Sequence, residues 1–96
     1  MRARQRRLHA LDAAARGLAE GHRFAEALDL ALDSVRDEPL RESAHRRVIL
    51  IHLSEGNACE AVRQYESFRT LLDVELGAPP SRALRQLVTT AMLESA

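Results

Sequence analysis

Apolar residues recur along this chain at the spacing of amphipathic helices. In the longest such stretch, residues 56–76, they follow each other at steps of four, three, four and four, which places them on one helical stripe. Gly77 then ends the pattern, and Pro79 and Pro80 push the backbone before them out of the α region. We therefore expect a long helix, a loop and a further helix that Ser81 caps. The stripe consists of Ala61, Tyr65, Phe68, Leu72 and Leu76.

The first half of the chain predicts two more helices of the same kind. One covers about residues 3–19 and ends at Gly21. The next covers about residues 24–36, since Pro39 limits how far it can run. The loop between them is short, so we expect them to be antiparallel neighbours. Their apolar stripes are Leu8, Leu11, Ala15 and Leu18 in the first, and Phe24, Ala27, Leu28, Ala31, Leu32 and Val35 in the second.

A third helix is expected to begin near Pro39 or Leu40 and to continue to Gly56. Proline is tolerated in a first helical turn, and the acidic residues around it suit the positive end of the helix dipole. A last helix covers about residues 82–93. The apolar residues of these two helices are Ala44, Val48, Leu50, Ile51 and Leu53, and Leu84, Leu87, Val88, Ala91 and Met92.

The chain also resembles itself at a nearly fixed interval. Residues 18–21 (LAEG) match residues 53–56 (LSEG) at an offset of 35, and residues 26–27 (EA) match residues 60–61 (EA) at 34. A period of ~34 residues, each with a helix, a tight glycine turn and a second helix, is typical of tetratricopeptide repeats. In these repeats each helix pair buries its face on the next. We expect two such repeats, built as antiparallel helix pairs, and a C-terminal helix that caps them.

Composition agrees with an all-α domain of about five helices. All 14 basic residues are arginine, alanine and leucine are abundant, and β-branched and aromatic residues are scarce. The 96 residues fit one small domain. The balance of 14 basic against 14 acidic residues indicates no polyanionic partner. No secretory signal and no apolar run of ~20 residues is visible, so we expect a cytoplasmic protein without membrane contact.

The one basic cluster lies at the N-terminus, in residues 1–7. Its arginines would spread over more than one face of a helix. Phosphate contacts made by such an arm would be independent of sequence and sensitive to salt. The alternative, which we favour, is a solvated and frayed helix start. The cluster consists of Arg2, Arg4, Arg6 and Arg7.

No pattern typical of a catalytic or metal-binding site is evident. The four histidines, at positions 9, 22, 45 and 52, include no pair at helical i, i+3 or i+4 spacing, so we expect no metal site. His45 and His52 are expected at a helix–helix contact instead. No nucleophile motif and no glycine-rich phosphate loop occurs, so we expect neither enzyme activity nor a cofactor. We interpret the single cysteine, Cys59, as a small packing residue rather than a redox sensor.

Three segments of the chain resemble a known family. They are residues 37–46 (DEPLRESAHR), 60–69 (EAVRQYESFR) and 75–81 (ELGAPPS). In these segments the chain resembles the bacterial transcriptional activator domain of the Streptomyces antibiotic regulatory proteins and their relatives, in its repeat-containing half. After Ser81 it departs from the family pattern, because Arg82 stands where the family usually has proline. This departure weakens the cap of the last helix without removing it.

The resemblance implies a tetratricopeptide-like fold and a role in transcription activation. Members of this family typically place a winged-helix DNA-binding domain ahead of the activator domain, and 96 residues leave no room for it. We therefore expect DNA contact only through a winged-helix domain absent from this chain. On this interpretation the chain is a fragment, an excised domain or a free-standing relative. The resemblance further implies that this domain supports dimerisation or contact with the transcription machinery.

One apolar surface is a candidate site for a protein partner. If Gly21 and Gly56 occupy the turns of the two repeats, six apolar residues map to the concave side, where tetratricopeptide arrays usually carry polar residues. A symmetric partner, the last helix or a preceding segment is expected to cover such a surface. The alternative is that the six are core residues in a shifted register. They are Leu8, Leu11, Ala15, Leu18, Leu50 and Leu53.

The sequence thus predicts a non-catalytic domain for protein interaction and oligomerisation in a bacterial transcriptional regulator, with a homodimer among its possible assemblies. The alternative is a generic tetratricopeptide scaffold that binds a peptide or helix of an unrelated partner.

Overall fold

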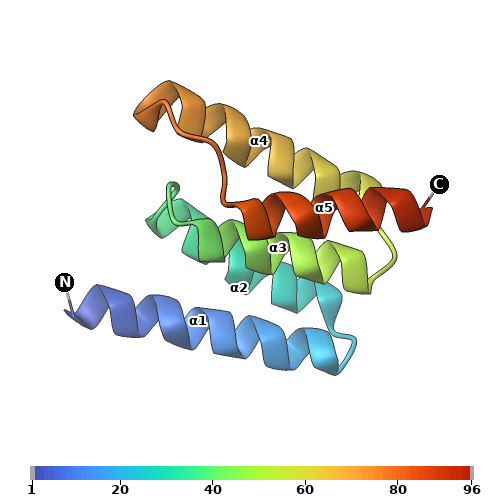
Figure 1. The fold of residues 1–96 in the computed structure, drawn as a ribbon. Coiled ribbons are helices and arrows are strands. Elements are labelled where there is room, and N and C mark those ends of the chain that lie inside the picture. The colour runs from blue at the N-terminus through green and yellow to red at the C-terminus, as the bar shows by residue number, and fades with distance from the viewer. Residues whose placement is uncertain (1, 96) are drawn as a thin grey trace.

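The computed structural model describes residues 2–95 of the chain, with side chains described for residues 6–94. In these residues the only regular elements are α-helices, which confirms the predicted all-α class (Figure 1). Four of the predicted helices agree with the structure to within two residues at each end. The helices are α1 (Arg2–Glu20), α2 (Phe24–Asp37), α3 (Glu42–Ser54), α4 (Ala58–Leu76) and α5 (Arg82–Ser95).

The helices form antiparallel pairs that stack side by side. Figure 1 shows α1, α3 and α5 running in one direction, with α2 and α4 running in the other. The pairs α1–α2 and α3–α4 are joined through contacts of α3 with both α1 and α2, and α5 packs on α4. The molecule measures 41 × 36 × 17 Å along its principal axes, so it is a slab about two helices thick. This is the predicted tetratricopeptide-like arrangement of two repeats with a capping helix.

The turns of the two repeats have the same hydrogen bonds. The carbonyl of Leu18 accepts from the N–H of Arg23, and the carbonyl of His52 accepts from the N–H of Asn57, both at 2.8 Å. In each turn the residue before that donor has a left-handed backbone: His22 with φ 61° and Gly56 with φ 77°. Six-residue loops closed in this way are Schellman motifs, which satisfy the last carbonyls of a helix.

One expectation about these turns is wrong. The sequence predicts Gly21 at the turn position that corresponds to Gly56, but His22 has the left-handed backbone and Gly21 precedes it. The two turns therefore correspond at 34 residues rather than 35. The matching LAEG and LSEG letters align residues that differ by one position in the structure.

The start of the third helix is also later than expected. Pro39 and Leu40 form a turn between α2 and α3, and α3 begins at Glu42. The N–H of Arg41 donates to the carbonyl of Glu38 at 3.1 Å, which closes a four-residue turn with proline in its second position. Proline is favoured there because its fixed φ matches that of the turn. Pro39 therefore occupies a β-turn before α3 rather than the first turn of the helix.

The core consists of two clusters that meet at α3. The N-terminal cluster lies between α1, α2 and α3, and the C-terminal cluster lies between α3, α4 and α5. The predicted stripe of α4 is buried up to Leu72, but Leu76 is 61% exposed, because the last turn of α4 extends beyond the core. The buried residues are Ala15, Ala27, Ala31, Val48 and Ile51 in the N-terminal cluster, and Ile49, Ala61, Tyr65, Phe68, Leu72, Leu84 and Val88 in the C-terminal cluster.

The N-terminal arm is part of α1 in the structure. Residues 2–7, expected to be frayed, form its first turns, and Arg7 pairs with Asp37 of α2. The side chains of Arg2 and Arg4 lie outside the described residues. Fraying of this arm stays a prediction.

Two glycines of similar surroundings are expected to respond to alanine in opposite directions. Gly77 ends α4 with φ 62°, so Gly77→Ala is expected to lower the free energy of unfolding by about 1 kcal/mol. Gly17 lies within α1, so Gly17→Ala is expected to raise it by about 0.5–1 kcal/mol. At both positions an added Cβ meets no atom within 4 Å, so the backbone alone decides the sign. Urea denaturation measures both changes, and shifts of the same sign would contradict the assigned backbone conformations.

Candidate protein-interaction site

The six apolar residues of the predicted partner surface do not share one exposed face. Leu8 and Ala15 are buried, with 2% and 0% of their surface exposed. Leu18 packs against the N-terminal cluster, and Leu53 packs against the C-terminal cluster. The half-buried members of the set are Leu11, Leu18, Leu50 and Leu53.

The shifted turn of the first repeat explains this placement. With the two repeats in correspondence at 34 residues, Ala15 corresponds to Ile49, and both have 0% of their surface exposed. The expected offset of 35 pairs Ala15 with Leu50 instead. A shift of one residue rotates a side chain by about 100° around the helix axis. Residues assigned to the concave face from the sequence are therefore divided between the core and the surface, while their role in binding a partner stays a prediction.

A groove between α1 and α3 remains open to a partner. Its volume is about 290 Å³. Arg47 of α3 donates from Nε to Asp12 Oδ1 of α1 at 3.0 Å, which holds the two helices together beside the groove. Leu50 supplies apolar surface there, next to charged groups from both helices. The groove is lined by Arg16, Ala19, Glu20, Arg47, Leu50, Ile51 and Ser54.

His45 joins the α2–α3 turn to α4. Its Nε2 lies 2.7 Å from the carbonyl oxygen of Pro39, and because a carbonyl can only accept, Nε2 carries the proton. Nδ1 is then the acceptor for the side-chain amide of Gln64 at 2.9 Å. The ring also stacks on Phe68, with centroids 4.2 Å apart and planes at 25°. His45 thus lies at a helix–helix contact as expected, whereas the described polar contact of His52 is Glu55, three residues further along the chain.

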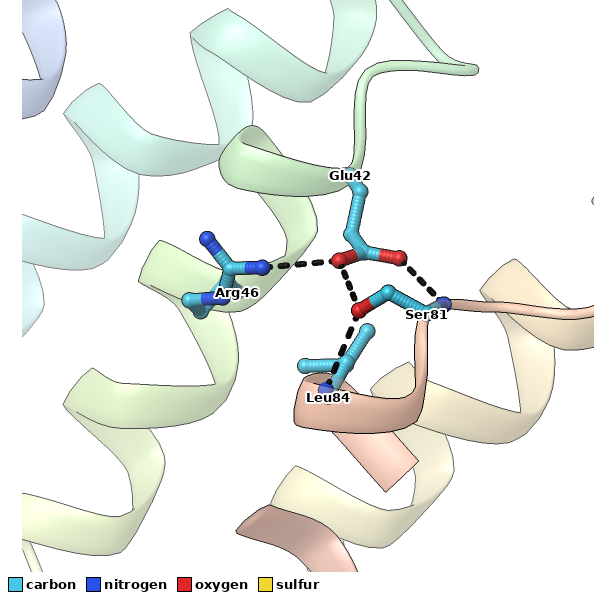
Figure 2. Close-up of polar contacts among 4 residues, drawn as sticks. All are labelled: Glu42, Arg46, Ser81 and Leu84. Atoms are coloured by element: carbon cyan, nitrogen blue, oxygen red, sulfur yellow. Dashed lines mark hydrogen bonds and ion pairs between the residues drawn. The ribbon is translucent and has the colours of Figure 1, made fainter. Parts of the chain in front are cut away.

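Glu42 at the start of α3 holds the start of α5, as Figure 2 shows. One carboxylate oxygen, Oε1, accepts from the backbone N–H of Ser81 at 2.8 Å. The other, Oε2, accepts from the Ser81 hydroxyl and from Arg46 Nη2, the latter at 2.7 Å. The Ser81 hydroxyl oxygen in turn accepts from the N–H of Leu84 at 3.2 Å. Ser81 therefore caps α5 as predicted, and Glu42 orients the cap.

These contacts shift the pKa of both titratable groups. Burial raises the pKa of Glu42, but the hydrogen bonds from Ser81 and the positive charge of Arg46 outweigh it, so the pKa lies below its ordinary 4.5. Burial lowers the pKa of His45 below its ordinary 6.5, and the hydrogen bond to the Pro39 carbonyl opposes this only in part. The folded domain thus favours an ionised Glu42 and a neutral His45.

The three segments that carry the family resemblance meet in this polar network. Segment 37–46 supplies Pro39, Glu42, His45 and Arg46, segment 60–69 supplies Gln64 and Phe68, and segment 75–81 supplies Ser81. The network positions the helices. None of its described contacts involves a residue that lines the groove between α1 and α3. It is therefore a structural centre that fixes the shape of the slab.

The structure also shows where the other sequence features stand, namely the cysteine, the possible metal ligands and the apolar content of the helices. Cys59 is exposed, so its interpretation as a small packing residue is wrong. Among the side chains that the structure describes, no three histidine, cysteine or acidic residues gather closely enough to hold a metal ion. None of the helices, over their described residues, is long and apolar enough to cross a membrane.

Comparison with known protein families shows to which family the chain belongs. A family model described as the bacterial transcriptional activator domain matches residues 1–90. The chain belongs to this family. The match confirms the resemblance inferred from the three segments, and it makes the chain a regulatory domain of the kind found in bacterial transcriptional activators. No curated protein and no solved structure matches this activator domain closely enough for comparison.

Loss of the Glu42 carboxylate is expected to destabilise the activator domain. Glu42→Gln should lower the free energy of unfolding by about 1–3 kcal/mol, because the hydrogen bonds from Ser81 and Arg46 lose their charged acceptor. Because the folded pKa lies below that of the unfolded chain, the contribution is present above pH 4.5 and is lost as the pH falls through the folded pKa. Urea denaturation at pH 7 and at pH 3.5 should show the difference between wild type and variant shrinking.

Glu66→Gln is the matched control for this experiment. Glu66 pairs with Arg69 on the exposed face of α4, and its loss is expected to cost less than about 1 kcal/mol. Equal effects of the two variants at pH 7 would contradict the role of Glu42.

His45 is expected to make stability depend on pH in a higher window. The unfolded chain binds a proton on this side chain more readily than the folded chain, so stability is complete above pH 6.5 and falls as the pH drops from there toward the folded pKa. His45→Gln should remove this part of the pH dependence, since glutamine does not titrate. Denaturation curves at pH 7.5, 6.5 and 5.5 measure it, and an unchanged pH slope in the variant would contradict the assignment.

Proposed function

We propose that this activator domain is a non-catalytic module for protein interaction and oligomerisation that supports transcription activation. The observation that carries the proposal is the groove between α1 and α3, where the half-buried Leu50 lies among charged residues. A small apolar area with a charged rim is the usual composition of a protein interface. Candidate occupants are a second copy of the chain and a segment of the transcription machinery.

The charges around the groove favour a protein partner over DNA. Arg47 is already paired with Asp12, and Glu20 lies on the same rim as Arg16. A duplex needs several uncompensated basic groups to bind at physiological salt. On this proposal a separate winged-helix domain recognises the promoter, and the groove binds the protein partner.

The two repeats supply a rigid support for such a contact. The groove-lining residues come from α1 and α3, which pack on each other and on α2. A site on packed helices keeps its side chains in place before a partner arrives, which lowers the entropic cost of binding. Of the six residues in the sequence prediction, Leu50 is the one that lines this groove, so the proposed partner-binding set is reduced to Leu50.

A charge placed in the groove is expected to weaken activation. With the chain joined to a heterologous DNA-binding domain upstream of a bacterial reporter, Leu50→Glu should lower expression about tenfold, the equivalent of ~1.4 kcal/mol of lost binding. Ala13→Glu, on the exposed side of α1, should leave expression unchanged. Circular dichroism of both purified variants confirms folding.

Light scattering over a range of concentrations separates the two occupants. A dimer that Leu50→Glu converts to monomer identifies a second copy in the groove, whereas a monomer at all concentrations identifies another protein. A folded Leu50→Glu variant with full reporter activity would contradict the proposed site.

A further inference from the structure

A second recess lies beside the molecule's polar network, because Pro39 belongs to both. It is an apolar notch of about 320 Å³ between the α2–α3 turn and the end of α4. Figure 1 shows this turn and the C-terminal end of α4 at the same end of the molecule. The notch shares no lining residue with the groove between α1 and α3. Its lining residues are Glu38, Pro39, Leu40, Leu71 and Glu75.

The notch exposes apolar surface that the core does not use. Leu40 in the turn is 37% exposed, and Leu71 faces it from α4 half-buried. Val74 is 74% exposed and lies three residues after Leu71, which makes the two neighbours on the helix surface. The turn at Pro39 holds Leu40 in this position, and His45 donates a hydrogen bond to the carbonyl of Pro39. The apolar patch is therefore a fixed part of the fold.

The two charged residues that line the notch, Glu38 and Glu75, are both acidic. Glu75 lies in the last turn of α4, where no basic residue is found. The C-terminal end of a helix carries a partial negative charge, so a carboxylate there is unfavourably placed. Among the residues whose side chains are described, none forms an ion pair with Glu75. A cationic group at this position would relieve the repulsion.

We propose that this notch binds a short basic segment of a partner protein. One leucine-like side chain of the segment rests on Pro39, Leu40 and Leu71, and an adjacent arginine or lysine pairs with Glu75. The notch is lined by only five residues, so binding is weak and suits an auxiliary contact made while the partner is held elsewhere. Nucleic acid does not fit this chemistry, because its phosphates would meet the carboxylate at the rim. The notch is a surface separate from that of the proposed function.

A titration followed by nuclear magnetic resonance tests the notch directly. The probe is a short synthetic peptide with one leucine between pairs of arginines, added to the ¹⁵N-labelled full chain. The expected result is a set of saturable shifts confined to the amides of Leu40, Arg41, Leu71, Val74 and Glu75. A peptide with glycine in place of leucine should bind about tenfold more weakly, and one with glutamates in place of arginines should give no shifts.

Two charge variants complete the experiment. Glu75→Arg should weaken binding of the basic peptide about tenfold or more. Glu94→Arg makes the same change in net charge near the end of α5 and should leave the affinity unchanged. Both positions are exposed, so the variants are expected to fold.

Other outcomes would overturn the proposal. Shifts scattered over the whole surface, or equal loss of binding in both variants, would mean non-specific attraction between charges. Notch shifts that appear on concentrating the protein without peptide would identify a second copy as the occupant. Shifts at the notch with a short DNA duplex, but not with the peptide, would identify nucleic acid.

Discussion

The carboxylate of Glu42 reaches across 39 positions of sequence to both the backbone and the side chain of Ser81. Helix α5 packs mainly on α4. The contact between Glu42 and Ser81 therefore fixes the point at which α5 meets α3. The loop that precedes it contains two prolines and cannot donate from those positions, which leaves the N–H of Ser81 as a main point of attachment. Glu42 thus fixes where the capping helix begins, and the buried Leu84 and Val88 pack this helix on the C-terminal cluster.

Periodicity in the sequence predicts the helices well, because their apolar stripes are regular and glycine or proline marks their ends. The two errors have physical causes. At the first repeat, the glycine that resembles a turn residue precedes the left-handed position, and His22 adopts that backbone against its intrinsic preference. At the α2–α3 junction, proline can begin a helix or occupy a turn, and the hydrogen bond from Arg41 to Glu38 selects the turn. Neither choice can be read from local residue types.

The candidate sites were harder to predict than the fold. A shift of one residue moved Ala15 into the core, which removed the basis for a continuous concave surface. The contact between Glu42 and Ser81 leaves no periodic signal, because it joins a helix start to a distant loop. The signal that did exist was the resemblance itself, since all three of its segments converge on the same polar network. The notch beside Leu40 follows from the unexpected turn, so no analysis of helical stripes could have found it.

The central helix belongs to two cores at once. Val48 and Ile51 of α3 pack toward the first repeat, while Ile49 packs toward the second and toward α5. In repeat proteins each unit commonly has its own stability and couples to its neighbours only through the interface between them. Here the interface helix supplies buried side chains to both units, so neither unit keeps a complete core when the other opens. The domain is therefore built to unfold in a single cooperative step, and a disturbance at either end is transmitted through α3 to the other.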